Sequence, residues 1–150
     1  MKLKKGDYKQ FALEDLAQMG YNSKNGFEQA KSTCMHAQQY VEKMIKDKIV
    51  ELFDTEPEKT HNLRVLLAAI IPEGLEIDPD LMLKAGILSD YYMATRYPDF
   101  KILSEITEET AEEAYRWSLE IVSFVDSIRR DEDGMISIEQ SESDDQYAGQ

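Results

Sequence analysis

Cysteine, glycine and proline are scarce in this chain. Of its 150 residues, one is Cys, seven are Gly and four are Pro. A single cysteine forms no intramolecular disulfide, and with two histidines it offers no zinc-ligand spacing. So few glycines and prolines also argue against repeats, collagen-like segments and long linkers. One ordinary globular domain is therefore the expected organisation.

Long hydrophobic runs are missing as well. No apolar stretch approaches the length of a membrane span, and residues 1–5 lead into polar sequence where a signal peptide would have an apolar core. We expect a cytoplasmic protein that does not interact with membranes. No metal or cofactor is expected either, because no phosphate-binding glycine loop or metal-ligand motif occurs.

Positive charge is in short supply. The formal net charge is −13, and seven acidic residues without any Lys or Arg lie in residues 131–150, which leaves −6 for residues 1–130. A protein that binds nucleic acid through a broad basic face has the opposite balance. We predict a helical body at 1–130 and an acidic tail at 131–150 whose composition is typical of disorder, although residues 135–138 suit a short strand.

The strongest pattern lies in residues 27–52. Apolar or small side chains recur there every three or four residues, at Phe27, Ala30, Cys34, Ala37, Val41, Met44, Ile45, Ile49 and Leu52. This spacing predicts a helix with one buried stripe, roughly 40 Å long at 1.5 Å per residue. Several other helices must cover a stripe of that length.

Four further helices are predicted, over about residues 8–20, 60–71, 78–97 and 107–128. Gly20 is the expected end of the first, with Asn22 supplying turn or N-cap chemistry for the long helix, and Thr60, Asp78 and Thr107 are the expected N-caps of the others. Short connections between five helices indicate an all-α fold, an up-and-down antiparallel bundle without a convincing strand in the body.

Polar residues in the middle of the long helix form the first candidate site. Gln39 and Lys43 suit a nucleotide or an RNA backbone. The alternative is that Lys43, Lys46 and Lys48 alternate with Glu42, Asp47 and Glu51 on a solvated helix face.

Two further candidates lie at the ends of helices. His61 has the residue type of a general base, a metal ligand or part of a helix cap. The guanidinium of Arg96 suits a phosphate or carboxylate, and the nearby Tyr91 and Tyr97 suit base stacking. Asp90 is a further candidate ligand-binding residue in this segment. The alternative places Tyr92 in the core and pairs Arg96 with Asp90 or Asp99.

An apolar set lies off the main helical stripes, at Phe100, Trp117 and Phe124. It predicts either a homodimer face or a thicker monomer core.

Three segments together resemble the HEPN family. Residues 36–46, His-Ala-Gln-Gln-Tyr-Val-Glu-Lys-Met-Ile-Lys, resemble the family's His-Ala-Gln-Gln-x-x-Glu-Lys-x-x-Lys helix. Residues 59–63, Lys-Thr-His-Asn-Leu, are similar to its Thr-His-(Asp/Asn)-Leu helix opening, and residues 91–98 resemble its Tyr…x-Arg-Tyr-Pro segment. The similarity covers about residues 8–130.

The resemblance implies an all-α bundle that dimerises and is often encoded beside a minimal nucleotidyltransferase, in many cases as a toxin–antitoxin pair. It also implies nucleotide or RNA binding in a cleft near Arg96. The family's ribonuclease branch carries a His four to six residues after this Arg, for general acid–base work on the ribose 2′-hydroxyl. No His occupies residues 97–103 here, so that motif is incomplete.

Three functions therefore compete. The first is a dimeric binding module for nucleotide, RNA or a nucleotidyltransferase. The second is a metal-independent ribonuclease that uses Arg96 and His61. The third is a protein-interaction scaffold whose acidic tail occupies a nucleic-acid site.

Overall fold

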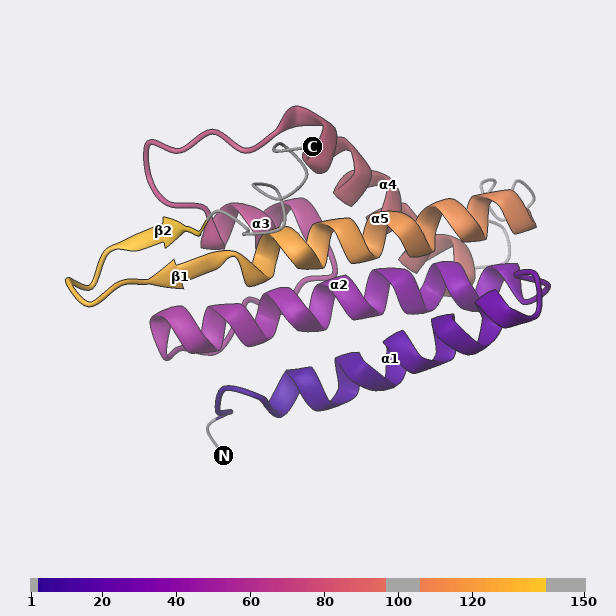
Figure 1. Cartoon of the computed structure of the whole chain (residues 1–150), viewed down its shortest axis with the longest axis horizontal. Helices are drawn as coiled ribbons and strands as arrows, with labels where there is room; N and C mark the ends of the chain where they lie inside the picture. The colour runs from indigo at the N-terminus through magenta and orange to yellow at the C-terminus, as the bar shows by residue number, and fades with distance from the viewer. Residues whose placement is uncertain (1–2, 97–105, 140–150) are drawn as a thin grey trace, which may run out of the picture.

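The computed structural model describes residues 3–96 and 106–139. Within these ranges it contains five helices and one antiparallel two-stranded sheet (Figure 1). The helices are α1 (Asp7–Lys24), α2 (Ala30–Phe53), α3 (Leu63–Ile70), α4 (Pro79–Arg96) and α5 (Glu108–Asp126), and the strands are β1 (Ile128–Arg130) and β2 (Ile136–Ile138). The predicted all-α bundle is confirmed.

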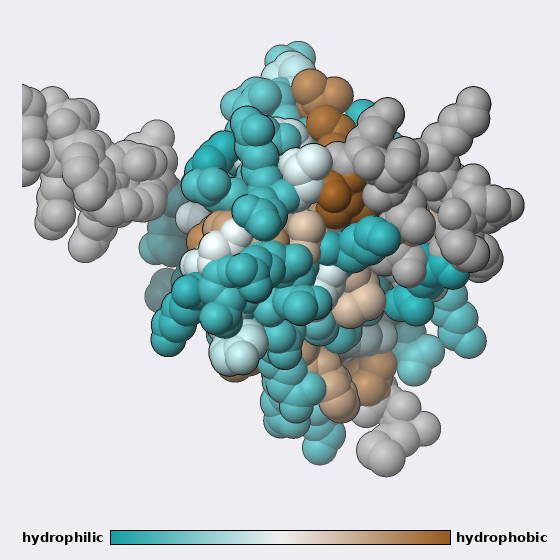
Figure 2. All heavy atoms as spheres, turned by 90° about the vertical axis from the view of Figure 1, so that its right-hand side faces the viewer, coloured by the Kyte–Doolittle hydropathy of each residue, from teal (hydrophilic) through white to brown (hydrophobic). Residues whose placement is uncertain are grey.

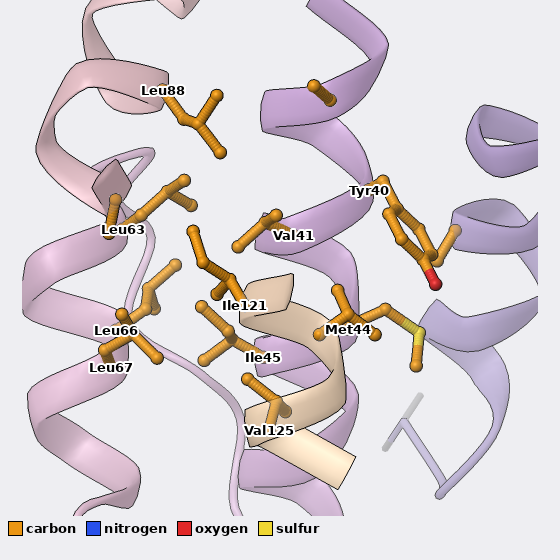
Figure 3. Packing of buried hydrophobic residues seen from close by; sticks show 14 of the residues in the cluster. Tyr40, Val41, Met44, Ile45, Leu63, Leu66, Leu67, Leu88, Ile121 and Val125 are labelled. Atoms are coloured by element: carbon orange, nitrogen blue, oxygen red, sulfur yellow. The ribbon is translucent and has the colours of Figure 1, made fainter. Parts of the chain in front are cut away.

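Helix α2 is the centre of the bundle. It contacts each of the other four described helices, and its apolar side chains meet those of α3, α4 and α5 in one core (Figure 3). Tyr40 and Met44 point the other way, toward α1 (Figure 3). Cys34 is fully buried, as the stripe predicted, and burial raises the pKa of its thiol to about 12. The thiol is therefore an inert part of the core.

The predicted end of the first helix at Gly20 is wrong. Helix α1 continues to Lys24, because the buried Asn22 side chain donates a hydrogen bond to Thr33 Oγ1 of α2 (3.0 Å). This contact between helices outweighs the roughly 1 kcal/mol that an interior glycine costs a helix. The turn comes later, where Gly26 and Phe27 both have positive φ.

The starts of the later helices are partly as predicted. Asn62, not Thr60, is the N-cap of α3, and its side chain accepts hydrogen bonds from the amides of Arg64 and Val65. Thr107 is the N-cap of α5, as predicted. Pro79 is the first residue of α4, with Asp78 Oδ1 accepting from the next free amide.

The prediction of a body without strands is wrong at its carboxyl end. Ile128 pairs with Ile138 and Arg130 with Ile136, so a hairpin crosses the boundary drawn at residue 130. The hairpin is attached to α2, because Lys48 Nζ donates to Ile128 O (2.9 Å) and Arg130 Nη2 donates to Leu52 O (2.6 Å). The division into body and tail remains a prediction, and residues 140–150 lie outside the described ranges.

At the end of the bundle shown in Figure 2, the exposed apolar side chains of the described residues form separate small patches among hydrophilic ones. Trp117 and Phe124 pack against the core, in line with the thicker-core alternative, while Phe100 lies outside the described residues. Of the helices in these ranges, none combines the length and the hydropathy that a bilayer crossing requires.

Candidate functional site

The polar residues of α2 are buried in the bundle. Glu42, Lys46, Asp47 and Lys48 are each at most 9% exposed, so the alternative of a solvated charged face is wrong for them. Buried charges are stable only when they are paired and hydrogen-bonded. Glu42 pairs with Lys46, Lys48 pairs with Glu51, and Asp47 accepts from the amide of Gly6. Two carboxylates, Asp15 of α1 and Glu42 of α2, also hold residues of the candidate site.

The first carboxylate fastens α1 to α2. Asp15 Oδ1 lies 2.7 Å from His36 Nδ1, and Asp15 Oδ2 accepts from Lys43 Nζ, also at 2.7 Å. Asp15 is buried, whereas His36 and Lys43 keep about a quarter of their side-chain surface. Lys43, a predicted ligand-binding residue, is therefore occupied in joining two helices.

The second carboxylate orients His61. Glu42 Oε1 lies 2.8 Å from His61 Nδ1, and Lys46 Nζ donates to Glu42 Oε2 at 3.2 Å. Gln38 Nε2 donates both to Glu42 Oε1 and to the backbone carbonyl of His61, at 3.0 and 3.1 Å. A carboxylate only accepts, so Nδ1 carries a proton, and in the neutral imidazole Nε2 is then the nitrogen with the lone pair. The His61 side chain is 49% exposed, which leaves its outer edge open to a ligand.

His61 and Arg96 meet through the ring of Tyr92. The imidazole stacks on this ring with the centroids 3.9 Å apart and the planes 17° apart. The Arg96 guanidinium carbon lies 4.3 Å from the same centroid. An imidazole and a guanidinium this close to one ring centroid would clash if both lay on the same face of the Tyr92 ring. His61 and Arg96 therefore cover opposite faces of it. His61, Tyr92 and Arg96 thus form a three-layer stack, called below the His61–Tyr92–Arg96 stack.

Arg96 is the exposed end of this stack. None of the ion pairs within residues 3–96 and 106–139 involves Arg96, so the alternative pairing with Asp90 is not formed. Asp90 is itself exposed on α4. Asp99 and the predicted ligand-binding residue Tyr97 lie outside the described residues.

The sequence matches the HEPN domain family over residues 6–128. The chain belongs to the HEPN family. Among solved structures it is similar to TT1696 from Thermus thermophilus, with 28% identity, a TM-score of 0.65, and coverage of 80% of this chain and 94% of that one. It has the fold of ST0689, an archaeal HEPN homologue, at 23% identity and a TM-score of 0.61, covering 83% and 96%. A search of the curated proteins finds no match.

The HEPN motifs on α2 and before α3 converge in this fold. Gln39 Nε2 donates to Gln38 Oε1 (2.6 Å), so Gln39 joins the Glu42 cluster through its neighbour. Of the predicted site residues in the described ranges, His61, Arg96 and Gln39 thus belong to one connected set. Lys43 belongs to the separate Asp15 cluster.

Tyr91 does not take part in the stack of this HEPN protein. It is 4% exposed, so the core face of α4 passes through Tyr91, whereas the sequence pattern favours Tyr92 for that place. Burial raises the pKa of the Tyr91 hydroxyl well above its usual range, and nearby acidic groups add to the effect. Tyr91 therefore packs in the core, and its ligand-binding role stays a prediction.

Two residues of the site escape prediction from the sequence. The helical pattern favours Tyr92 as a core residue and Glu42 as a surface charge. A signal for Tyr92 is present, since Tyr92 and Arg96 are four residues apart and neighbours on a helix face. The charge pattern does not mark Glu42, because its partner His61 lies 19 residues away, and the one signal for it is the Glu of the family's His-Ala-Gln-Gln-x-x-Glu-Lys helix.

No metal-binding site emerges from the described ranges, where no group of three or more His, Cys, Asp or Glu side chains is arranged to hold an ion. A separate hollow of about 270 Å³ lies between the start of α1, the second half of α2 and the end of α5, and its charged lining consists of Lys5, Lys9, Lys48, Arg129, Asp47, Glu51 and Asp126. Lys5 and Lys48 pair there with Glu51, and Arg129 pairs with Glu139, so most of its cations are neutralised and the His61–Tyr92–Arg96 stack is the better candidate site.

Proposed function

We propose that this HEPN protein binds a nucleotide or a short RNA at the His61–Tyr92–Arg96 stack. The observation that carries the proposal is the exposed Arg96 guanidinium, which lies on the Tyr92 ring without an ion pair to any described carboxylate. A guanidinium held in this way offers phosphate a planar fork of donors and offers a base a flat cationic face. In a chain of net charge −13, an exposed cation without an ion pair in the described ranges is a local site for an anion.

Replacing Arg96 with alanine should reduce the affinity for AMP and for a six-nucleotide RNA by tenfold or more. The physical reason is that hydrogen bonds to charged groups contribute about 1.5–3 kcal/mol each. Arg96→Lys keeps the positive charge but loses the planar pair of donors, so its affinity should lie between those of the wild type and Arg96→Ala. Fluorescence titration measures each affinity.

Arg129→Ala is the matched control for the titration. It removes one exposed arginine from β1, where Arg129 pairs with Glu139, so the change in net charge is the same. Equal affinities for the wild type, Arg96→Ala and Arg129→Ala would refute the proposed site.

Ribonuclease activity is a second candidate, supported by the hydrogen bond between Glu42 and His61. A carboxylate that holds Nδ1–H stabilises the imidazole in the tautomer whose Nε2 accepts a proton, as a general base must. His61 thereby offers this HEPN chain a base from a different segment than the family's Arg-then-His motif.

RNA cleavage in EDTA should then disappear in both His61→Gln and Arg96→Ala. His61→Gln keeps a hydrogen-bond donor toward Glu42 while it removes the base, which separates chemistry from folding. Gel electrophoresis of incubated RNA measures cleavage. Cleavage that persists in both variants would belong to a contaminant or to another site and would eliminate this candidate.

We also propose a homodimer in the cytoplasm and a nucleotidyltransferase as a partner, on the strength of HEPN family membership alone. Light scattering of the purified chain tests the dimer, and co-purification with a neighbouring nucleotidyltransferase tests the partner.

A non-catalytic scaffold is the third candidate. Deleting residues 131–150 tests whether the tail masks an RNA site, because unchanged RNA binding after the deletion would eliminate masking.

A further inference from the structure

Arg64, on the first turn of α3, is fixed against the backbone of α4. Its Nε donates to the carbonyl of Met82 at 3.1 Å. A Cβ at Gly86 would lie 2.5 Å from both Nε and Nη2 of Arg64, closer than real contacts allow. Gly86 thus leaves the space that the guanidinium fills. Arg64 is exposed, so solvent or a ligand can reach a side chain that is already positioned.

The residues of α4 that meet the start of α3 lie on one helix face. They follow one another at steps of four, three, three and four, which is the spacing of a single stripe. These residues are Met82, Gly86, Ser89, Tyr92 and Arg96.

The start of α3 contacts this stripe in antiparallel order. His61 stacks on Tyr92, the amide of Leu63 donates to Ser89 Oγ (2.8 Å), and Arg64 lies one turn further toward the beginning of α4. We call this line of contacts the α3–α4 seam. It carries one guanidinium at each end, with His61 beside Arg96 at the second end.

The two guanidiniums are separated by a distance that suits a short strand. Along the axis of α4, the Arg64 guanidinium lies beside Gly86 and the Arg96 guanidinium lies beside Tyr92. Six residues of helix separate these two positions, which corresponds to roughly 9 Å. A stacked nucleic-acid strand advances about 3.4 Å per nucleotide, so roughly two to three nucleotides cover this length. A single nucleoside monophosphate carries one phosphate and cannot place a phosphate at both positions.

Neither guanidinium is neutralised by a partner in the described ranges. No ion pair there includes Arg64 or Arg96, whereas the exposed Arg129 pairs with Glu139. Asp90 lies on α4 at the flank of the stripe and is the acid closest to it in sequence. Two arginines held in place without carboxylates form a pair of positions for successive phosphates.

We propose that the α3–α4 seam binds short single-stranded RNA, with Arg64 as a second phosphate-binding residue. The inference rests on the proposed function at Arg96 and extends it from a mononucleotide to a strand. The His61–Tyr92–Arg96 stack holds one nucleotide, and Arg64 holds a phosphate two to three nucleotides away, at roughly the spacing derived above.

The test compares AMP with a six-nucleotide RNA in fluorescence titrations of the full chain. Arg64→Ala should weaken RNA binding about tenfold and leave AMP binding unchanged. Because each phosphate contact contributes about 0.7 to the slope of log affinity against log salt for single strands, the RNA slope should decrease by roughly that amount. Gly86→Ala keeps the charge but displaces the guanidinium, so it should weaken RNA binding by a smaller factor.

Arg129→Ala controls for the loss of one exposed positive charge and should leave both affinities unchanged. RNA binding and a salt slope that are the same in Arg64→Ala as in the wild type would overturn the inference. If Arg96→Ala nevertheless lost AMP binding, the proposed function at Arg96 would hold and only the extension to Arg64 would fail. Polyglutamate that displaced the RNA from the wild type but not from Arg64→Ala would assign the seam to an acidic protein and would also overturn the inference.

Discussion

Replacing Glu42 with alanine is expected to lower the free energy of unfolding by about 3–5 kcal/mol, the usual cost of breaking a buried ion pair on one side. The carboxylate accepts hydrogen bonds from Lys46, His61 and Gln38, and is itself only 7% exposed. Its removal leaves the nearly buried Lys46 ammonium without its counter-charge. Urea denaturation at pH 7 measures the loss.

Glu120→Ala is the control for this change. Glu120 pairs with Lys84 on the surface, where an ion pair contributes little, so its loss should be much smaller. Glu42→Ala should also weaken ligand binding at the stack, because His61 loses the group that holds its ring against Tyr92. Equal stability of the two variants would show that the buried cluster does not stabilise the bundle.

Asp15→Ala should lower the free energy of unfolding by a similar amount, about 3–5 kcal/mol. Asp15 joins the helices α1 and α2 through His36 and Lys43, and the substitution leaves the Lys43 ammonium facing the helix interface alone. We expect the largest effect in α1, whose amides should exchange with deuterium faster relative to those of α5. Denaturation and hydrogen exchange measure the two effects.

Glu14→Ala is the neighbouring control, since Glu14 is exposed on the same helix. Asp15→Ala should leave the affinity for AMP close to that of the wild type, because its cluster is separate from the stack. Faster exchange throughout the chain, with no preference for α1, would contradict the role of Asp15 as the link between these two helices.

The helices are predictable where hydrophobic spacing alone determines them. The stripe of α2 from Cys34 to Leu52 appears in the core as expected, and the Thr107 cap begins α5. The end of α1 is not predictable, because the extra turn depends on Asn22 reaching Thr33 of another helix. A local signal such as Gly20 indicates the free-energy cost of continuing the helix. It contains no information on the contact with another helix that stabilises the extra turn.

The site is predictable in its composition but not in its connections. His61 and Arg96 are identified from residue type and from resemblance, yet the contact between them runs through Tyr92, one position away from the tyrosine predicted to bind. A shift of one residue turns a helical side chain by about 100°. This rotation puts Tyr91 in the core and Tyr92 at the surface.

The hydrogen bond between Glu42 and His61 has a consequence for how the family diverges. Glu42 is a core residue by burial and contacts His61 of the candidate site, so under the proposed function selection for stability and selection for binding act on the same carboxylate. A relative that replaces the histidine leaves this acid with one partner fewer in a region of low dielectric constant. The two positions should therefore vary together across homologues, even though 19 residues separate them in the chain.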